Sequence, residues 1–393
     1  MKILHIVQTY VPAYHLGGTI KSVHELNKWL VKKGAEVTVY TTDINGPEDL
    51  NVPVNQLVDL DGVKVFYFKH SFPRAWSYSK YLRRALAENA KNFDIIHSTG
   101  VFLMAATLGA YYAKKFNKPL IISPRGSLMV EPLKKKSPLK KRIYISLIEK
   151  RNLASASVIH FTVDSEKKDY LEDGLPLKKA VVIPNGFDPE EFKEKSPLGF
   201  FREKFGISSD KKTILFLSRL SPIKGIDTLI PAFAEVIKKN AEAVLVLAGS
   251  DDRGYKKIIN QLIKKYNLSR YVIFTGLLIG EDKISAFQDS DVFVLPSYSE
   301  SFGNVVLEAM YFGLPVVITE KVGIAPSVSR VNAGLVIKKD VNQLAEAILK
   351  ILNNPTLAEQ MGKNGKKLVE TEFSWQNIAE EFIKEYDKII KNY

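Results

Sequence analysis

The 393-residue chain has no cysteine and only six histidines, and these two shortages exclude several kinds of chemistry. Without cysteine there is no disulfide bond, no thiol nucleophile and no cysteine-ligated zinc, and the chain is compatible with a reducing cytoplasm. Because the histidines are scattered singly along the sequence, they do not suggest a metal cluster. We therefore expect no bound metal.

Two common nucleotide-binding fingerprints and long apolar segments are also missing. Neither a Walker pattern nor Gly-x-Gly-x-x-Gly occurs, which makes an ATPase or a nicotinamide-dependent oxidoreductase a poor interpretation. The longest apolar run, residues 101–113, is too short to cross a bilayer and suits a buried helix. The N-terminal apolar run ends at Gln8, which predicts a first β-strand and not a signal peptide.

The composition, 46% hydrophobic and 25% charged, is typical of a soluble globular protein, and the length allows two domains. The formal net charge of +13 predicts a polyanionic neighbour: nucleic acid, an anionic membrane surface or a phosphorylated ligand. Basic residues concentrate from Lys134 to Arg142, just before the apolar run 143–148. This segment is either a basic amphipathic helix that lies on anionic lipid or an ordinary solvated surface.

Short β-branched runs alternate with helical patterns in two series, separated by a turn-rich linker at 184–197. Such alternation predicts an α/β protein with two doubly wound parallel sheets, whose ligand sites face each other across a cleft. A last amphipathic helix is expected from Trp375. The predicted strands are residues 3–7, 36–41, 63–68, 94–97, 120–123, 158–161 and 181–183, then 214–218, 243–248, 272–275, 292–295 and 316–319.

Residues 296–315 form the most informative stretch, because they join a buried strand to a helix that stops at Gly313. The helix N-terminus favours an anion, and Gly303 lets it come close. Glu300 and Glu308 would repel phosphate alone, but they could accept hydrogen bonds from the diols of a ligand that carries both hydroxyls and phosphate. Alternatively, both glutamates are ordinary helix residues.

Two cations follow the first strand of the second series. Arg219 offers a planar fork and Lys224 a mobile point charge, a combination suited to a diphosphate whose charge grows as it leaves. The alternative is a pair of unremarkable surface cations.

These motifs together resemble the nucleotide-sugar signature of the retaining GT-B glycosyltransferases, glycosyltransferase family 4 in particular. The resemblance covers the Glu-x7-Glu pattern from Glu300 to Glu308, and the Arg-x4-Lys-Gly spacing from Arg219. It is strongest from 181 to 334 and weaker through the first series. Other matching stretches are residues 183–188, 248–250, 275–277 and 323–326.

The resemblance implies two Rossmann-like domains: residues 1–185 completed by the helix 375–393, on the acceptor side, and residues 186–374, which bind the nucleotide sugar. The implied reaction moves a sugar from a nucleoside-diphosphate donor to a hydroxyl acceptor, lipid-linked or a glycan precursor. Anomeric configuration is retained by a front-face mechanism without metal. Apart from the resemblance, the missing cysteines favour a cytoplasmic location, and the basic segment 134–142 allows either peripheral membrane contact or an ordinary solvated surface.

Each residue then has a hypothetical role. Glu308 binds the ribose diol, Glu300 the donor-sugar hydroxyls, and Arg219 with Lys224 the departing diphosphate. Asp289 and Asp291 look like a metal motif, but we interpret them as local turn chemistry. The remaining donor-site residues would act through their backbone groups. The base would be held by Gly276 and Leu277. The diphosphate would be held at the helix N-terminus by Ser301, Phe302, Gly303, Asn304 and Val305.

Three places in the first series are candidates for the other side of the reaction. Gly17 and Gly18 could contact donor phosphate or acceptor, or simply form a turn. His97 stands where relatives carry His-x-His, with Thr99 in the second position, and is either catalytic or structural. Arg125 is interpreted as an acceptor or phosphate contact.

Two other functions remain open. A GT-B sugar-nucleotide epimerase would act without an acceptor. A nucleic-acid-binding protein would explain the charge, but the sequence shows no interleaved exposed aromatics and no known nucleic-acid motif. The base, the sugar, the acceptor and the oligomeric state do not follow from the sequence.

Overall fold

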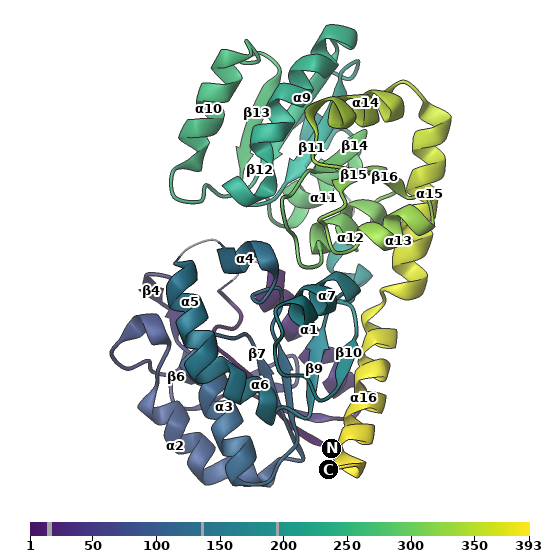
Figure 1. Ribbon diagram of the computed structural model, residues 1–393. Helices are drawn as coiled ribbons and strands as arrows, with labels where there is room; N and C mark the ends of the chain where they lie inside the picture. The colour runs from purple at the N-terminus through teal and green to yellow at the C-terminus, as the bar shows by residue number, and fades with distance from the viewer. Residues whose placement is uncertain (14–17, 135–136, 194–195) are drawn as a thin grey trace. The chain divides into compact units, whose positions relative to one another are not determined.

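The computed structural model describes residues 1–13, 18–134, 137–193 and 196–393. They form two compact units, each built on its own sheet (Figure 1). Unit 1 comprises Met1–Gly186 and Trp375–Tyr393, and unit 2 comprises Phe187–Ser374. The predicted fold class, two parallel α/β sheets, is confirmed.

The sheet of unit 1 has the strand order β10-β9-β8-β7-β1-β2-β6-β5, and every pairing is parallel except that of β5 with β6. A separate two-stranded ribbon joins β3 and β4. The strands are β1 Lys2–Val7, β2 Glu36–Thr42, β3 Ile44–Asn45, β4 Glu48–Asp49, β5 Leu57–Leu60, β6 Val63–Phe68, β7 Ile95–Thr99, β8 Leu120–Ser123, β9 Val158–Phe161 and β10 Ala180–Val182.

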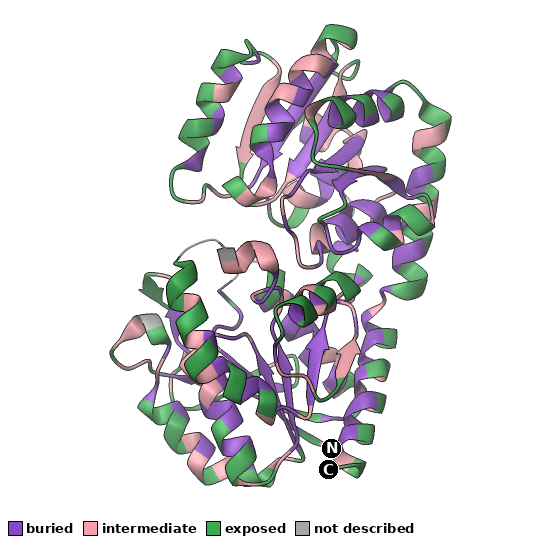
Figure 2. Cartoon of the chain, viewed as in Figure 1, coloured by how far each residue is buried: buried purple, intermediate pink, exposed green. Residues whose placement is uncertain are grey.

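Both faces of this sheet are buried, as the continuous apolar runs predict (Figure 2). Successive residues point to opposite faces, so Ile3 belongs to one apolar core and Leu4 to the other. Helices α1 and α16 cover the first face, and α2, α3 and α6 the second. The helices are α1 Gly18–Lys32, α2 Lys80–Asn89, α3 Met104–Lys115, α4 Val130–Lys134, α5 Pro138–Tyr144, α6 Lys150–Ser155, α7 Asp164–Glu172 and α16 Trp375–Lys391, with 3-10 turns at Arg74–Trp76 and Ala90–Asn92 and a π turn at Ile145–Glu149.

The last helix, α16, returns to unit 1 and completes its core (Figure 1). Its apolar stripe, with Phe382 and Tyr386 at its middle, packs with residues of α1. The Trp375 ring lies so close to Gly186 that a β-carbon there would stand 2.4 Å from it. Hydrophobic spacing predicted this helix but could not assign it to a domain.

Unit 2 holds a six-stranded parallel sheet of order β13-β12-β11-β14-β15-β16. The strands are β11 Lys212–Leu217, β12 Ala243–Ala248, β13 Val272–Gly276, β14 Val292–Leu295, β15 Val316–Thr319 and β16 Gly334–Ile337. The helices are α8 Phe200–Lys204, α9 Ile226–Lys239, α10 Tyr255–Lys265, α11 Gly280–Gln288, α12 Asn304–Tyr311, α13 Ala325–Arg330, α14 Val341–Leu352 and α15 Pro355–Glu372, with 3-10 turns at Pro189–Phe192 and Pro222–Lys224.

Each sheet has one point at which the strand order reverses. In unit 2 the chain runs outward from β11 through β12 to β13, then restarts beside β11 with β14. In unit 1 the corresponding point lies between β1 and β7. Loops diverge at such a point and leave a crevice at the carboxyl ends of the strands, where ligands of α/β proteins bind. His97 and Thr99 lie on β7, and Arg219, Lys224 and Glu300 lie in the loops after β11 and β14.

Candidate active site

In unit 2 the loops after β11 and β14 flank the switch point and are fastened to each other. The backbone N–H of Tyr298 donates to the carbonyl of Ile223 at 2.8 Å. Gly225 begins α9 with φ of 74°, and a β-carbon there would stand 1.9 Å from the carbonyl oxygen of Pro296. Only glycine allows this approach, which explains the glycine that follows Lys224 in the motif.

Lys224 and Glu300, predicted from two separate motifs, form an ion pair across this switch point. Both side chains are mostly buried, with exposed fractions of 12% and 21%. Arg219, in the same loop as Lys224, is exposed and forms no ion pair within the described part of the chain. The structure therefore joins one predicted cation to one predicted carboxylate and leaves a second cation open to an anion.

The loop before α12 is held by the segment after β15. The N–H of Gly323 donates to the carbonyl of Glu300 at 2.9 Å, and that of Ile324 donates to Phe302 at 3.0 Å. Gly303 precedes the helix with φ of 101°, and a β-carbon there would stand 2.9 Å from Cγ1 of Val322. The matching stretch 323–326 therefore positions the N-terminus of α12 and with it the backbone N–H groups of the first turn.

The residues of this loop differ in accessibility. Phe302 is buried and packs edge-on against Phe373 at 6.0 Å between ring centroids, so its side chain anchors the loop. Ser301, Asn304 and Val305 are half-buried. These residues are therefore the more accessible part of the loop at the helix N-terminus.

Glu308 lies in the middle of α12 and is paired with a residue that the sequence analysis did not identify. Lys283 of α11 places Nζ 2.7 Å from a carboxylate oxygen of Glu308, and the exposed fractions are 20% and 11%. The same ammonium group lies 5.6 Å from the ring centroid of Phe192. Nothing in the sequence around Lys283 distinguishes it from the many other lysines.

The candidate base-binding residues, Gly276 and Leu277, lie where β13 ends. The carbonyl of Gly276 accepts a hydrogen bond from Gly249 at 2.7 Å, which connects two of the stretches that match the family. Leu277 is exposed and presents its side chain and backbone to solvent. This loop lies one strand beyond β12, at the carboxyl edge of the same sheet.

In unit 1, Gly17 lies outside the described residues, and Gly18 is the first residue of α1. His97 and Thr99 lie on β7, beside β1 at the switch point. Thr99 is buried, and its hydroxyl is bonded to Nε2 of His5 at 2.8 Å. Its hydroxyl is therefore used inside the protein.

The suggestion that His97 is catalytic needs correction. The residue has no exposed surface, and both ring nitrogens are bonded: Nδ1 to the hydroxyl of Tyr386 at 2.7 Å and Nε2 to that of Ser123 at 2.6 Å. A substrate cannot reach either nitrogen in this arrangement. Burial lowers the pKa of His97 well below its usual value, so the ring is neutral. His97 connects α16 to the sheet, which is a structural role.

A further buried histidine, His160, extends this network. His160 bonds to Ser123 through Nδ1 at 2.7 Å and to the carbonyl of Ile183 through Nε2 at 2.8 Å. Because a carbonyl only accepts, Nε2 of His160 carries the proton, and Ser123 must donate to Nδ1. Ser123 then accepts from Nε2 of His97, whose Nδ1 accepts from Tyr386. This chain of donors and acceptors holds when both rings are neutral, the state that burial favours by lowering their pKa values.

Arg125, predicted to contact the acceptor or a phosphate, is the charged candidate in unit 1. It follows β8 and has a positive φ of 53°. Its Nη1 donates to Asn185 at 2.5 Å, while its buried Nε has no hydrogen-bond partner. Burial lowers the pKa of Arg125 to about 10, which still leaves it protonated at neutral pH. The buried Glu166, which accepts from the N–H of Gly126 at 2.5 Å, raises it again. Arg125 thus keeps a positive charge on a side chain that is only half-buried.

Asp289 and Asp291 bind groups of distant segments, so the interpretation as local turn chemistry needs correction. Asp289 accepts from the N–H groups of Gly199 and Phe201 at 2.8 and 2.9 Å. Asp291 accepts from the N–H of Thr213 at 2.8 Å and pairs with Arg202 at 3.1 Å. These bonds fix the start of α8 and of β11.

One group of residues within the described chain has the composition of a metal site. Potential ligand atoms of Asp43, Asp49 and His70 lie within 4.8 Å of one another. However, Lys69 pairs with Asp43 at 3.1 Å and with Asp49 at 2.6 Å, and Arg74 pairs with Asp49 at 2.5 Å. Two side-chain cations therefore already neutralise the carboxylates that an ion would need.

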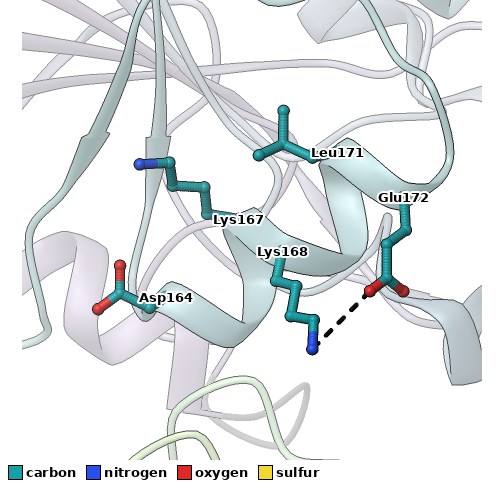
Figure 3. A pocket seen from close by; sticks show the side chains of 5 residues that line it. All are labelled: Asp164, Lys167, Lys168, Leu171 and Glu172. Carbon is teal, nitrogen blue, oxygen red and sulfur yellow. Dashed lines mark ion pairs between the residues drawn. The ribbon is translucent and has the colours of Figure 1, made fainter.

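A surface hollow of about 450 Å³ lies elsewhere, along α7 (Figure 3). It is lined only by side chains of this helix, including the pair Lys168 and Glu172 at 3.9 Å. None of the predicted site residues contributes to it. Its mixed charges and single-helix wall give it no selectivity for a ligand, so we assign it no function.

Sequence models of two glycosyltransferase families match the two halves of the chain. The one described as "Glycosyltransferase Family 4" matches residues 16–191, and the one described as "Glycosyl transferases group 1" matches residues 199–368. The chain belongs to these glycosyltransferases. The resemblance found in the motifs of unit 2 therefore extends to unit 1, where the sequence signal was weaker.

Curated proteins and a solved structure agree with this membership. An uncharacterized glycosyltransferase of Methanocaldococcus jannaschii is 28% identical over 98% of both chains. The alpha-monoglucosyldiacylglycerol synthase of Streptococcus pneumoniae is 28% identical over 81% of this chain and 70% of its own. Sucrose-phosphate synthase from Thermosynechococcus elongatus matches the fold with a TM-score of 0.79, at 22% identity over the full length of both chains. This glycosyltransferase has the GT-B fold.

Proposed function

We propose that this glycosyltransferase moves a sugar from a nucleoside-diphosphate sugar to a hydroxyl acceptor, with retention of the anomeric configuration and without a metal ion. The observation that carries the proposal is the Lys224–Glu300 pair at the switch point of unit 2. It puts a cation for the phosphate beside a carboxylate for hydroxyls, a combination that neither an ATP site nor a simple anion site requires.

The donor diphosphate is held by positive groups from both sides of the switch point. Arg219 and Lys224 approach from the β11 loop, and the backbone N–H groups at the start of α12 from the β14 loop. Negative charge grows on the diphosphate as the glycosidic bond breaks, so these groups bind the transition state more tightly than the ground state. They supply the charge that a divalent cation supplies in other transferases.

The two carboxylates hold the sugars on either side of that diphosphate. Glu308 accepts hydrogen bonds from the ribose diol, and Glu300 from hydroxyls of the donor sugar. Each carboxylate is paired with a lysine, Glu308 with Lys283 and Glu300 with Lys224. These lysines hold the carboxylates in place before the donor arrives, so less freedom is lost on binding.

On the acceptor side we propose Arg125 and the backbone of Gly18. Arg125 keeps its charge and is only half-buried, whereas His97 and Thr99 are buried. The name of the Streptococcus pneumoniae relative includes a glucosylated diacylglycerol, which favours a lipid-linked or cell-envelope acceptor here as well. We also propose a cytoplasmic location, which suits a chain without cysteine.

Thermal-shift measurements with UDP, GDP, ADP and dTDP test the donor site. A ligand that binds only the folded state raises its melting temperature, so we expect a shift with at least one nucleotide and a smaller one in Glu308→Gln. No shift with any of the four would contradict the proposal.

The reaction itself is tested with the donor that carries this nucleotide. Incubation of the donor alone distinguishes a transferase from an epimerase, because only the epimerase converts it to an epimer. The anomeric configuration of the transfer product, read by NMR, then tests retention. Turnover that survives EDTA supports metal independence, and turnover abolished by EDTA and restored by a divalent ion contradicts it.

A further inference from the structure

We propose that the helical segment 137–155 of unit 1 is a docking surface for an anionic lipid bilayer. In this segment, called the docking helix below, α5, the π turn and α6 follow one another without a break. The sequence suggested a basic segment at 134–142. Of that range, Lys135 and Lys136 lie outside the described residues, and the structure moves the surface further along the chain.

A stripe of aliphatic side chains runs along the outer side of the docking helix. Leu139, Ile143 and Leu147 recur every four residues and are 71%, 50% and 60% exposed. The opposite side, with Ile145 and Leu153, is buried in the core of unit 1. Figure 2 shows α5 largely exposed beside the buried sheet. Three large apolar side chains in a row on one helix indicate a contact surface, whereas single ones are ordinary.

Exposed cations border the stripe and no exposed acidic residue interrupts it. Lys140, Arg142, Lys150 and Arg151 are exposed and form no ion pair within the described residues. The single acidic residue of the segment, Glu149, turns inward and accepts from the N–H of Phe102 at 2.7 Å. Removing that carboxylate from the surface leaves an outer face that is positive throughout.

This combination fits a bilayer better than other polyanions. Aliphatic side chains enter the boundary between headgroups and acyl chains while lysine and arginine contact anionic headgroups. Nucleic-acid surfaces instead use aromatic side chains on which bases stack, and the stripe has none. A protein interface would extend well beyond one helix-wide stripe. No helix in the described chain is long and apolar enough to cross a membrane, so the contact is peripheral.

The test is co-sedimentation of the full-length protein with vesicles. We expect binding to phosphatidylcholine vesicles that contain about one third phosphatidylglycerol, and much weaker binding to pure phosphatidylcholine. Lys140→Gln with Arg142→Gln should weaken binding to the anionic vesicles about thirtyfold. Leu139→Gln with Leu147→Gln should weaken it at least tenfold, because two aliphatic chains no longer enter the lipid.

Lys264→Gln with Lys265→Gln is the matched control, since it removes the same charge from exposed positions of α10 in unit 2. It should bind vesicles like the wild type. Equal binding of the wild type to both vesicle types, binding to neither, or an effect of the control as large as that of the charge variant would overturn the proposal. Circular dichroism establishes that each variant is folded.

The consequence for catalysis rests on the proposed function, because a docked enzyme would meet a lipid-linked acceptor at the bilayer surface. Nucleotide binding to unit 2 should be unchanged in the two docking-helix variants. Loss of vesicle binding with intact nucleotide binding therefore isolates the docking surface. Failure of nucleotide binding in the wild type would concern the donor site alone.

Discussion

Replacement of Lys224 by alanine should lower turnover by a factor of about a hundred or more, with little change in the fold. The side chain is 12% exposed and its ammonium group contacts Glu300, so it acts in a poorly hydrated place where charge is weakly screened. At an effective dielectric constant of about 20, a unit charge about 4 Å away contributes roughly 4 kcal/mol. Even three quarters of this energy, applied only in the transition state, corresponds to about a hundredfold in rate.

The assay is steady-state turnover with the donor identified by nucleotide binding. Lys257→Ala, an exposed lysine on α10, is the matched control and should keep normal turnover. Glu300→Gln and the double variant Lys224→Ala with Glu300→Gln complete a double-mutant cycle, which separates the loss of Lys224 from the effect of leaving Glu300 unpaired. If Lys224→Ala kept near-normal turnover while folded, the role of Lys224 in stabilising the departing diphosphate would be refuted.

Three further predictions concern the donor site of unit 2 and the buried histidines of unit 1. Lys283→Met should raise the KM for the donor about fivefold with kcat unchanged, because Glu308 loses the ion pair that orients it. An unchanged KM would contradict this prediction. Tyr386→Phe should cost unit 1 about 1–3 kcal/mol, seen in its thermal unfolding, because Nδ1 of buried His97 loses its donor; wild-type stability would show that the bond contributes nothing. Burial lowers the pKa of His5 to about 4 and that of His160 to about 3. Below pH 6.5 the unfolded chain therefore binds protons that the folded protein does not. The free energy of unfolding should be highest above pH 6.5 and should fall by about 1.4 kcal/mol per pH unit for each histidine as the pH drops toward these values. Urea denaturation between pH 7 and about 4.5 measures this slope, and a flat profile would contradict it.

Much of the fold follows from the sequence because parallel strands buried on both faces are continuous apolar runs. The strands of both predicted series are present in the structure. The exceptions are informative: β5 is an antiparallel edge strand whose residues alternate between exposed and half-buried, and β16 is short and begins with Gly334. Neither has the uninterrupted apolar pattern that identifies a central strand, so the pattern did not predict them.

The donor-site motifs were visible because they depend on local geometry. Gly225 and Gly303 sit at positive φ against neighbouring backbone or side chains, and such positions constrain the sequence near them. Partnerships between distant elements leave no such trace. Lys283 reaches Glu308 from another helix, and Tyr386 reaches His97 from the far end of the chain. For the same reason the burial of His97 could not be inferred from its place at the end of a predicted strand.

Calorimetric titration of the wild-type protein and of Arg219→Ala with nucleoside diphosphates tests the donor site most directly. We expect one nucleoside diphosphate to bind the wild type, and to bind at least tenfold more weakly when the exposed guanidinium is removed. Absence of binding to the wild type, or equal affinity in both proteins, would mean that the switch point of unit 2 does not hold a pyrophosphate.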